Sequence, residues 1–163
     1  MEFAHEAQAV RLSQVEMTQL VLPQFANAHG NIFGGQILSW IDICAAIAAQ
    51  RHARSNVVTA SMDAMQFLLP IKLGHTVILK GQVNAVFHTS MECGISVWSE
   101  NHITGERRRA MKAYATFVCL DEYGRPKVVR PAIYETEDDQ RRAHEAQQRR
   151  AERLKSRTLG KKI

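Results

Sequence analysis

One long helical segment, in a chain otherwise rich in strand-like segments, most constrains the fold. Residues Gln36 to about Arg54 contain no proline or glycine, and their apolar residues recur at helical spacing. The recurring residues are Ile37, Leu38, Ile41, Ala45, Ile47 and Ala48. The segment ends on Arg51 and His52, and cations suit the negative end of a helix. Its many alanines would let a sheet wrap closely around it.

Strand-like segments lie on both sides of this helix. One precedes it, Val15–Leu22, and stops at Pro23. Those that follow are Val57–Pro70, Thr76–Phe87, Ser90–Ser99 and Arg109–Leu120. Short turns separate them, two of which contain Gly74 and Gly105, and connections this short imply antiparallel pairing. We therefore expect an α+β fold, in which one antiparallel sheet packs against one central helix.

A charged segment closes the chain. We expect a compact domain over residues 1–134, with a loose or short helical lead-in at 1–14, and a charged C-terminal helix or tail over 135–163. The tail has nine Lys/Arg and six Asp/Glu, so it carries +3 of the net charge of +5. Its helix starts near Thr136, but Gln140–Arg157 has no adequate apolar stripe, so it should lie on the surface or fray. No aromatic residue follows Tyr134, which favours a solvated helix over a nucleic-acid-binding tail.

Several classes of protein are disfavoured by what the sequence lacks. The longest mostly apolar stretch, Ile37–Ala49, is too short to span a bilayer, so no membrane insertion is expected. Met1–Val10 has no Lys or Arg, unlike a secretory signal. Three separated cysteines, Cys44, Cys93 and Cys119, argue against a disulfide scaffold or zinc site and suit a reducing cytoplasm. Phosphate-binding and dinucleotide-binding glycine motifs are absent, as is a nucleophile elbow.

Three features could carry chemistry. Gly34 and Gly35 sit where the helix begins, and free backbone N–H groups there can stabilise an oxyanion, although the pair could also be a simple tight turn. Asp42 lies within an apolar stripe, and no Lys or Arg occurs between Glu16 and Arg51 to pair with it. A buried, unpaired carboxylate is costly, so it needs a partner or a purpose, unless it is solvated. Asn27 is a neutral amide in the preceding loop, where a turn role is the simpler interpretation.

Together these residues resemble a known family. The matching runs are Asn27 to Asp42 (NAHGNIFGGQILSWID), Arg51 to Asp63 (RHARSNVVTASMD), Phe67 to Gly74 (FLLPIKLG) and Thr89 to Met91 (TSM). In this order and spacing they resemble the acyl-CoA thioesterase family, which includes cytosolic acyl-CoA hydrolases and bacterial relatives. The resemblance covers roughly residues 15–131.

The resemblance implies a hotdog fold, paired into a double-hotdog dimer that can assemble into a hexamer, and a cytoplasmic enzyme that hydrolyses acyl-CoA to free fatty acid and CoA. It implies that Asn27 and Asp42 form the catalytic pair, from opposite subunits. It further implies that CoA, part of the substrate and not a cofactor, binds along two segments. These segments are Ala60-Ser61-Met62 and Thr89-Ser90-Met91. The family often has histidine where this chain has Phe33, so a histidine role at that position is in doubt.

Alternatives remain open from the sequence. The chain could be a non-catalytic acyl-CoA sensor, or a hydratase or dehydratase of the same fold, although no histidine stands at helical spacing to Asp42. Asp42 could act as general base on water or as nucleophile. Arg107, Arg108, Arg109 and Lys112 could meet CoA phosphates, but strand alternation lets at most half of them face one ligand.

Overall fold

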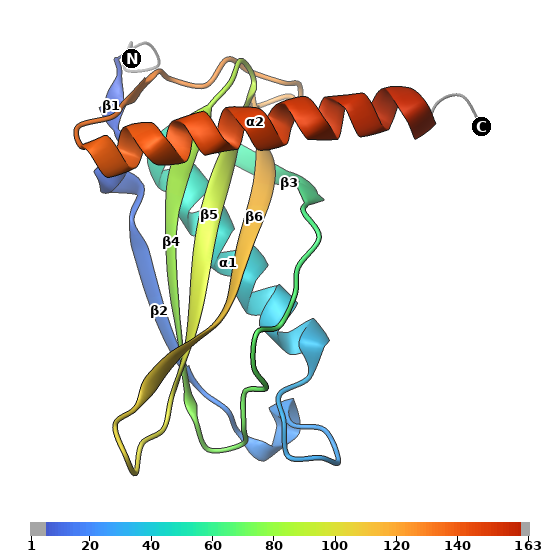
Figure 1. Cartoon of the computed structure of the whole chain (residues 1–163). Helices are drawn as coiled ribbons and strands as arrows, with labels where there is room; N and C mark the ends of the chain where they lie inside the picture. Colours follow the sequence, from blue (N-terminus) through green and yellow to red (C-terminus); the bar gives the residue numbers. More distant parts are fainter. Residues whose placement is uncertain (1–5, 161–163) are drawn as a thin grey trace.

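The protein, seen here as a computed structural model that describes residues 6–160, is built on one curled sheet of five strands (Figure 1). All neighbouring strands are antiparallel, and α1 (Gly34–Ala53) runs along the inside of the curl. The strand order is β2 (Val15–Leu20), β4 (Thr76–Val86), β5 (Ser90–Glu100), β6 (Arg107–Leu120) and β3 (Asn56–Met62). This arrangement confirms the predicted α+β hotdog fold.

Small residues let α1 lie close to the sheet. Cys44, Ala45 and Ala48 are fully buried at the centre of the hydrophobic core. Gly81 on β4 faces the helix, and a Cβ added there would lie 2.9 Å from the Cys44 Sγ. The alanine-rich helix and the glycine therefore set the close approach of helix and sheet.

The stretch Val57–Pro70, predicted to be extended, is strand only in its first half. β3 ends at Met62, and the chain then leaves the edge formed by β3 to begin β4 beside β2, on the other side of the sheet. Two backbone hydrogen bonds tie this connection to β6: from the Asp63 N–H to the Tyr114 carbonyl at 3.0 Å and from the Leu68 N–H to the Ala110 carbonyl at 2.8 Å. β3 and β4 are not neighbours in the sheet. The chain therefore leaves the sheet after Met62 and crosses the domain before it begins β4.

Two short segments, one before the sheet and one between the sheet and the C-terminal helix, pair with each other beside the sheet. β1 (Gln8–Ala9) pairs in parallel with β7 (Ala132–Ile133), and two short 3-10 helices, Val10–Ser13 and Pro23–Phe25, flank β2. The predicted lead-in therefore holds a strand and a helical turn, although residues 1–5 lie outside the described part. No helix within residues 6–160 is long and apolar enough to cross a membrane.

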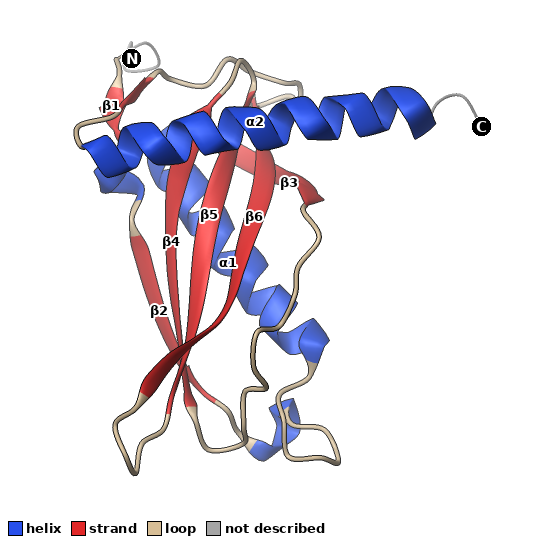
Figure 2. Cartoon of the chain, viewed as in Figure 1, coloured by secondary structure: helices blue, strands red, loops and turns tan. Residues whose placement is uncertain are grey.

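The C-terminal helix α2 (Glu137–Gly160) crosses the outer face of the sheet, opposite α1 (Figures 1 and 2). Ala143 and Ala146 are buried against the sheet near Ala85. The expectation of a solvated or fraying helix was therefore wrong in part. The helix does lie on the surface, but two small residues and long-range ion pairs dock it.

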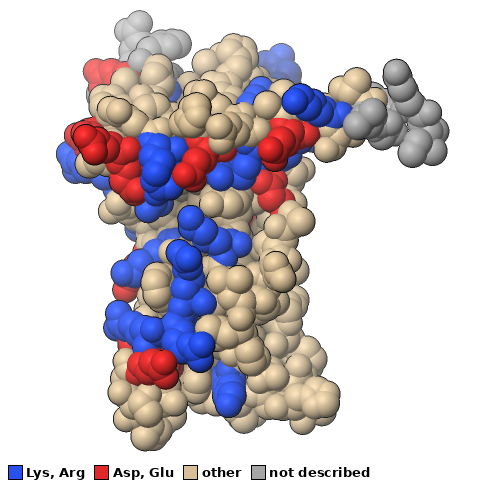
Figure 3. Space-filling view, in the orientation of Figure 1, with Lys and Arg blue, Asp and Glu red and all other residues tan. Residues whose placement is uncertain are grey.

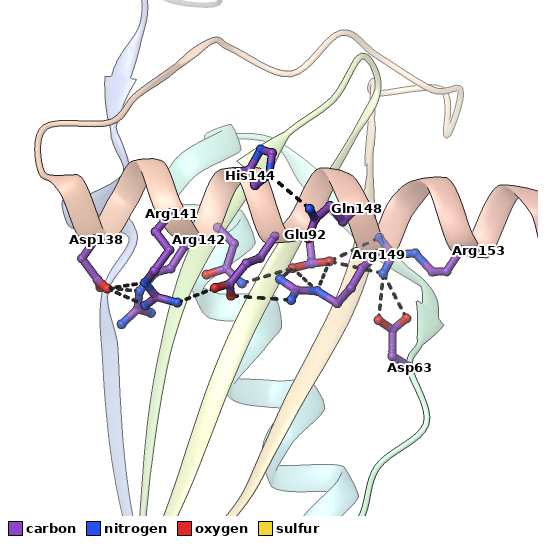
Figure 4. A network of polar contacts seen from close by, with 11 residues as sticks. Asp63, Glu92, Asp138, Arg141, Arg142, His144, Gln148, Arg149 and Arg153 are labelled. Carbon is purple, nitrogen blue, oxygen red and sulfur yellow. Dashed lines mark hydrogen bonds and ion pairs between the residues drawn. The ribbon is translucent and has the colours of Figure 1, made fainter.

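Glu92 on β5 is the centre of those ion pairs (Figure 4). Its side chain is 0% exposed, and it accepts hydrogen bonds from Arg149 at 2.7 Å, Arg153 at 3.2 Å and Asn84 at 3.1 Å. Arg153 also pairs with Asp63 at 2.8 Å, and the Arg149 guanidinium lies 3.6 Å from the centre of the Tyr114 ring. Burying a carboxylate without partners is costly, and here α2 supplies two of the three partners, Arg149 and Arg153.

Candidate active site

Asp42 lies two turns into α1 and contacts the edge strand. Its Oδ1 accepts a hydrogen bond of 2.8 Å from the Thr59 hydroxyl on β3. The carboxylate is half-buried, not buried and unpaired as expected, because β3 passes beside this face of the helix and supplies the hydroxyl. Thr59 was missed from the sequence because no local pattern connects residues that pair only when the sheet wraps around the helix. The pair leaves the second carboxylate oxygen, Oδ2, without a hydrogen-bond partner among residues 6–160.

Asn27 holds its loop together and keeps a donor free. Its Oδ1 accepts hydrogen bonds from the backbone N–H groups of His29 at 2.9 Å and Asn31 at 3.2 Å. The predicted turn role is therefore confirmed. Within the described chain its Nδ2 has no acceptor, and no hydrogen bond joins Asn27 to Asp42. The turn fixes the amide with its N–H₂ group available to another molecule.

Gly34 and Gly35 are the first residues of α1, as predicted. Phe33 provides no side-chain cap, and the first backbone N–H groups with an acceptor belong to Gln36 and Ile37, which bond to the Phe33 carbonyl. Both glycines are exposed, and an added Cβ at Gly35 would meet nothing within 4 Å. The N–H groups of both glycines are therefore open to an oxyanion at the positive end of the helix.

An apolar hollow of about 400 Å³ opens beside this helix start. Its walls come from the loop before α1 and from the connection between β3 and β4. The lining residues are Asn31, Ile32, Gly34, Phe67, Leu68, Leu69, Pro70 and Ile71. The hollow has the chemistry needed for a hydrocarbon group whose carbonyl lies over Gly34.

The two segments expected to bind CoA lie on either side of β6 and follow one another along it. Met91 is level with Thr59, since both pair with Phe117. Ser61 is level with Glu92, since both pair with Thr116, so the two strands are about 10 Å apart at the usual strand spacing. A β-bulge at Ala60 interrupts β3 beside Thr59, and bulges often redirect side chains near functional sites. The Met91 side chain is fully buried in the core, so only its backbone is available to a ligand.

Helix α2 contacts one of these segments and the residue that follows the other. Arg150 donates to the Ser90 hydroxyl at 3.3 Å, and Arg153 pairs with Asp63, the residue after Met62. The charged tail therefore fixes the ends of both segments, which the sequence did not indicate.

Other reactive groups do not form a site. Burial raises the pKa of the Cys44 thiol to about 11 and also raises that of Cys93, so neither forms the nucleophilic thiolate at neutral pH. Among residues 6–160 no cluster of His, Cys, Asp and Glu could hold a metal ion.

Comparisons with known proteins agree with this geometry. Residues 29–106 match the Thioesterase superfamily. The chain is 40% identical over 148 residues to the uncharacterized acyl-CoA thioester hydrolase YkhA of Bacillus subtilis, covering 91% of this chain and 86% of that protein. It covers only 24% of the mouse acyl-coenzyme A thioesterase 11, at 41% identity over 142 residues.

Two solved structures share the fold over nearly the whole chain. An apo-hexameric acyl-CoA thioesterase is 39% identical, with a TM-score of 0.90 over 94% of this chain and 99% of that one. The Staphylococcus aureus acyl-CoA hydrolase, solved with butyryl-CoA, CoA and CoA disulfide, is 34% identical, with a TM-score of 0.87 over 96% and 95%. Alanine variants of an asparagine, an aspartate and a threonine of that enzyme have also been solved. The chain belongs to the acyl-CoA thioester hydrolase family of the thioesterase superfamily.

Proposed function

We propose that this acyl-CoA thioester hydrolase cleaves its substrate at a site that combines Asp42 of one copy with Asn27 and the start of α1 of another. The observation that carries the proposal is the half-buried Asp42 carboxylate, held at 2.8 Å by Thr59 beside an edge strand. Support comes from the S. aureus variants, whose three replaced residues are spaced along that chain as Asn27, Asp42 and Thr59 are spaced here.

The need for a second copy follows from the length of α1. Asp42 lies seven residues beyond Gly35, or about 10 Å along the helix axis. A carbonyl bound by the Gly35 N–H is therefore out of reach of Asp42 in the same chain. β3 is an edge strand with Val58 46% exposed, so it can pair with a second copy. We infer a homodimer with two shared sites that assembles further into a hexamer, as supported by the hexameric relative.

The chemistry assigns one task to each group. The Gly34 or Gly35 N–H donates to the thioester oxygen as it becomes negative, and the Asn27 Nδ2 donates to the carbonyl or the water. Thr59 holds one oxygen of Asp42, so the other oxygen faces the substrate. Asp42 takes a proton from water, which attacks the carbonyl carbon, or attacks that carbon itself to form an anhydride that water then opens. Either route consumes one water and releases a carboxylic acid and the CoA thiol.

The substrate occupies both sides of this site. The acyl chain fits the apolar hollow beside Gly34, and CoA runs along Ala60–Met62 and Thr89–Met91. No cofactor is required, because CoA belongs to the substrate. A cytoplasmic location is supported by the relatives that are named cytosolic hydrolases.

Replacing Asp42 tests the mechanism. We expect Asp42→Ala to lower kcat for acyl-CoA, followed with a free-thiol reagent, by about 10²–10⁴, the usual contribution of a general base. Ser39→Ala, an exposed change on the same helix, should leave kcat unchanged. Unchanged hydrolysis by Asp42→Ala would reject the role, and binding without thiol release by the wild type would indicate a sensor.

Mixing variants tests the shared site. Asp42→Ala and Asn27→Ala chains, each inactive alone, are unfolded and refolded together at equal amounts. Because half of the dimers are then mixed and each mixed dimer has one intact site, about a quarter of the wild-type activity should return. If no activity returns although mixed dimers form, each chain carries its own complete site.

A further inference from the structure

The basic run Arg107–Lys112 does not face the thioester site. Lys112 pairs with Ser96, and Ser96 with Lys80, which places all three side chains on the outer face of the sheet. Their neighbours along the strands, Val97 and Ala113, are buried in the core on the α1 side. A bulge between Val97 and Trp98 sets Trp98 opposite Arg109, which also faces outward. Arg109 and Lys112 are therefore on the far side of the sheet from Asp42.

These residues line a groove of about 620 Å³ between α2 and the sheet (Figure 3). Its floor is formed by β4, β5 and β6, and its roof by the first half of α2. The cations along it are Lys80, Arg109, Lys112, Arg141, Arg142 and Arg149. Only two carboxylates, Glu16 and Glu145, line it. Figure 3 shows basic side chains gathered below α2, with few acidic ones among them.

Most of these cations form ion pairs, but two of them form none with the described residues. Arg149 is bound to Glu92, and both Arg141 and Arg142 are bound to Asp138. Arg109 and Lys112 form no ion pair within residues 6–160. Lys80 pairs with Glu16 only at 3.4 Å and on the exposed surface, where such a pair is weak. Glu145 is near enough to Lys112 to interact with it electrostatically, so the positive charge on the neighbouring strands of the floor is only partly compensated.

A buried amide adds a polar group to the groove. Asn84 is 3% exposed, its Nδ2 donates to Glu92, and its Oδ1 has no hydrogen-bond partner. Its amide lies across Gly94, where an added Cβ would be 2.4 Å from the Nδ2. Buried oxygens without a partner are rare, and no donor within residues 6–160 reaches this one, so it is available to a hydroxyl or N–H group of a ligand.

We propose that this groove binds the phosphate groups of a phosphorylated small molecule, at a site separate from the thioester site. Arg109 and Lys112 bind the phosphate oxygens, the Ser96 hydroxyl lies between Lys80 and Lys112, and Asn84 accepts from a hydroxyl or amine of the ligand. The phosphates come either from a free metabolite or from CoA bound at the thioester site of a neighbouring copy. CoA bound at the thioester site of the same chain does not reach the groove, because the two lie on opposite faces of the sheet. The second source rests on the proposed function, whereas the first does not.

Binding of tripolyphosphate to the full chain, measured by isothermal titration calorimetry, tests the site. The double variant Arg109→Gln/Lys112→Gln should weaken binding at least about tenfold, because each lost charge-assisted hydrogen bond is worth about that much. Arg125→Gln/Lys127→Gln, which removes the same charge from the exposed turn after β6, should change it less than about twofold, the scale of a screened surface charge. Both variants should keep the wild-type melting temperature, since all four side chains are exposed.

Acyl-CoA kinetics distinguish the two sources of phosphate. An unchanged KM in the Arg109→Gln/Lys112→Gln variant indicates a free metabolite, and a raised KM with competition between CoA and tripolyphosphate indicates CoA of a neighbouring copy.

Three results would overturn the site: no saturable binding of tripolyphosphate by the wild type, an equal loss of binding in the control pair, or a smaller assembly of the groove variant by light scattering. The last would mean that a second copy covers the groove. Each leaves the thiol-release assay of the wild type unaffected, so the proposed function is judged separately.

Discussion

Helix α1 packs against the inner face of the sheet through isoleucines, alanines and Cys44, whereas α2 crosses the outer face through two alanines and a set of ionised side chains. The first helix is held by close packing with a glycine and with apolar side chains. The second is held by a buried carboxylate, whose partners are far away in the sequence. The difference shows that one sheet can fix two helices with opposite chemistry, one by shape and one by charge.

The comparison also separates two roles. α1 carries the carboxylate that we propose to be catalytic and the open N–H groups, so its packing fixes where they lie. α2 contacts one segment expected to bind CoA and the residue after the other, and it covers the basic groove, so its attachment fixes the proposed binding surfaces. Each of the following predictions tests one of these two modes of attachment.

The largest effect is expected where charge holds α2. Glu92→Ala leaves Arg149 and Arg153 without their buried partner, and breaking a buried ion pair costs about 3–5 kcal/mol. Glu145→Ala, which removes an exposed partner of Arg141 on the same helix, should cost no more than about 1 kcal/mol. Urea unfolding measures both. Equal costs would mean that charge does not hold α2.

A smaller effect is expected where shape holds α1. Gly81→Ala places a Cβ 2.9 Å from the Cys44 Sγ, and such overpacking costs about 1–3 kcal/mol. Removing the sulfur should relieve the clash. The loss of unfolding free energy in Gly81→Ala/Cys44→Ala should therefore be smaller than the sum of the losses in the two single variants. Additive single effects would show that helix and strand have room to separate.

The smallest effect concerns pH and the end of α1. His52 is fully buried, its Nε2 contacts the Arg130 carbonyl at 3.1 Å, and burial lowers its pKa below the usual 6.5. The unfolded chain therefore takes up a proton below pH 6.5 that the folded chain does not, so stability is full above that pH. Stability is lost as the pH falls below it, by at most about 1.4 kcal/mol per pH unit. Urea unfolding between pH 7 and 5 measures how steeply the unfolding free energy falls with pH. His52→Gln should lower that slope by up to about 1.4 kcal/mol per pH unit, which corresponds to one proton. An unchanged slope would assign the pH dependence to other groups.

Local sequence patterns determined much of this protein. The helical spacing of apolar residues located α1, and turn glycines and prolines separated most of the strands. Residue type and position made Asn27, Gly34, Gly35 and Asp42 candidates, and the family resemblance suggested the catalytic pair. These features depend on the backbone period and on turn chemistry, which neighbouring residues encode.

Only the tertiary structure decided which distant residues meet. It put β3 at the sheet edge with Thr59 on Asp42, and it buried Glu92 beneath arginines that follow it by more than fifty residues. A bulge turned Arg109 away from the thioester site. Such contacts depend on strand order, register and the desolvation of charges, and no short stretch of sequence contains that information because it arises only when separate segments pack together.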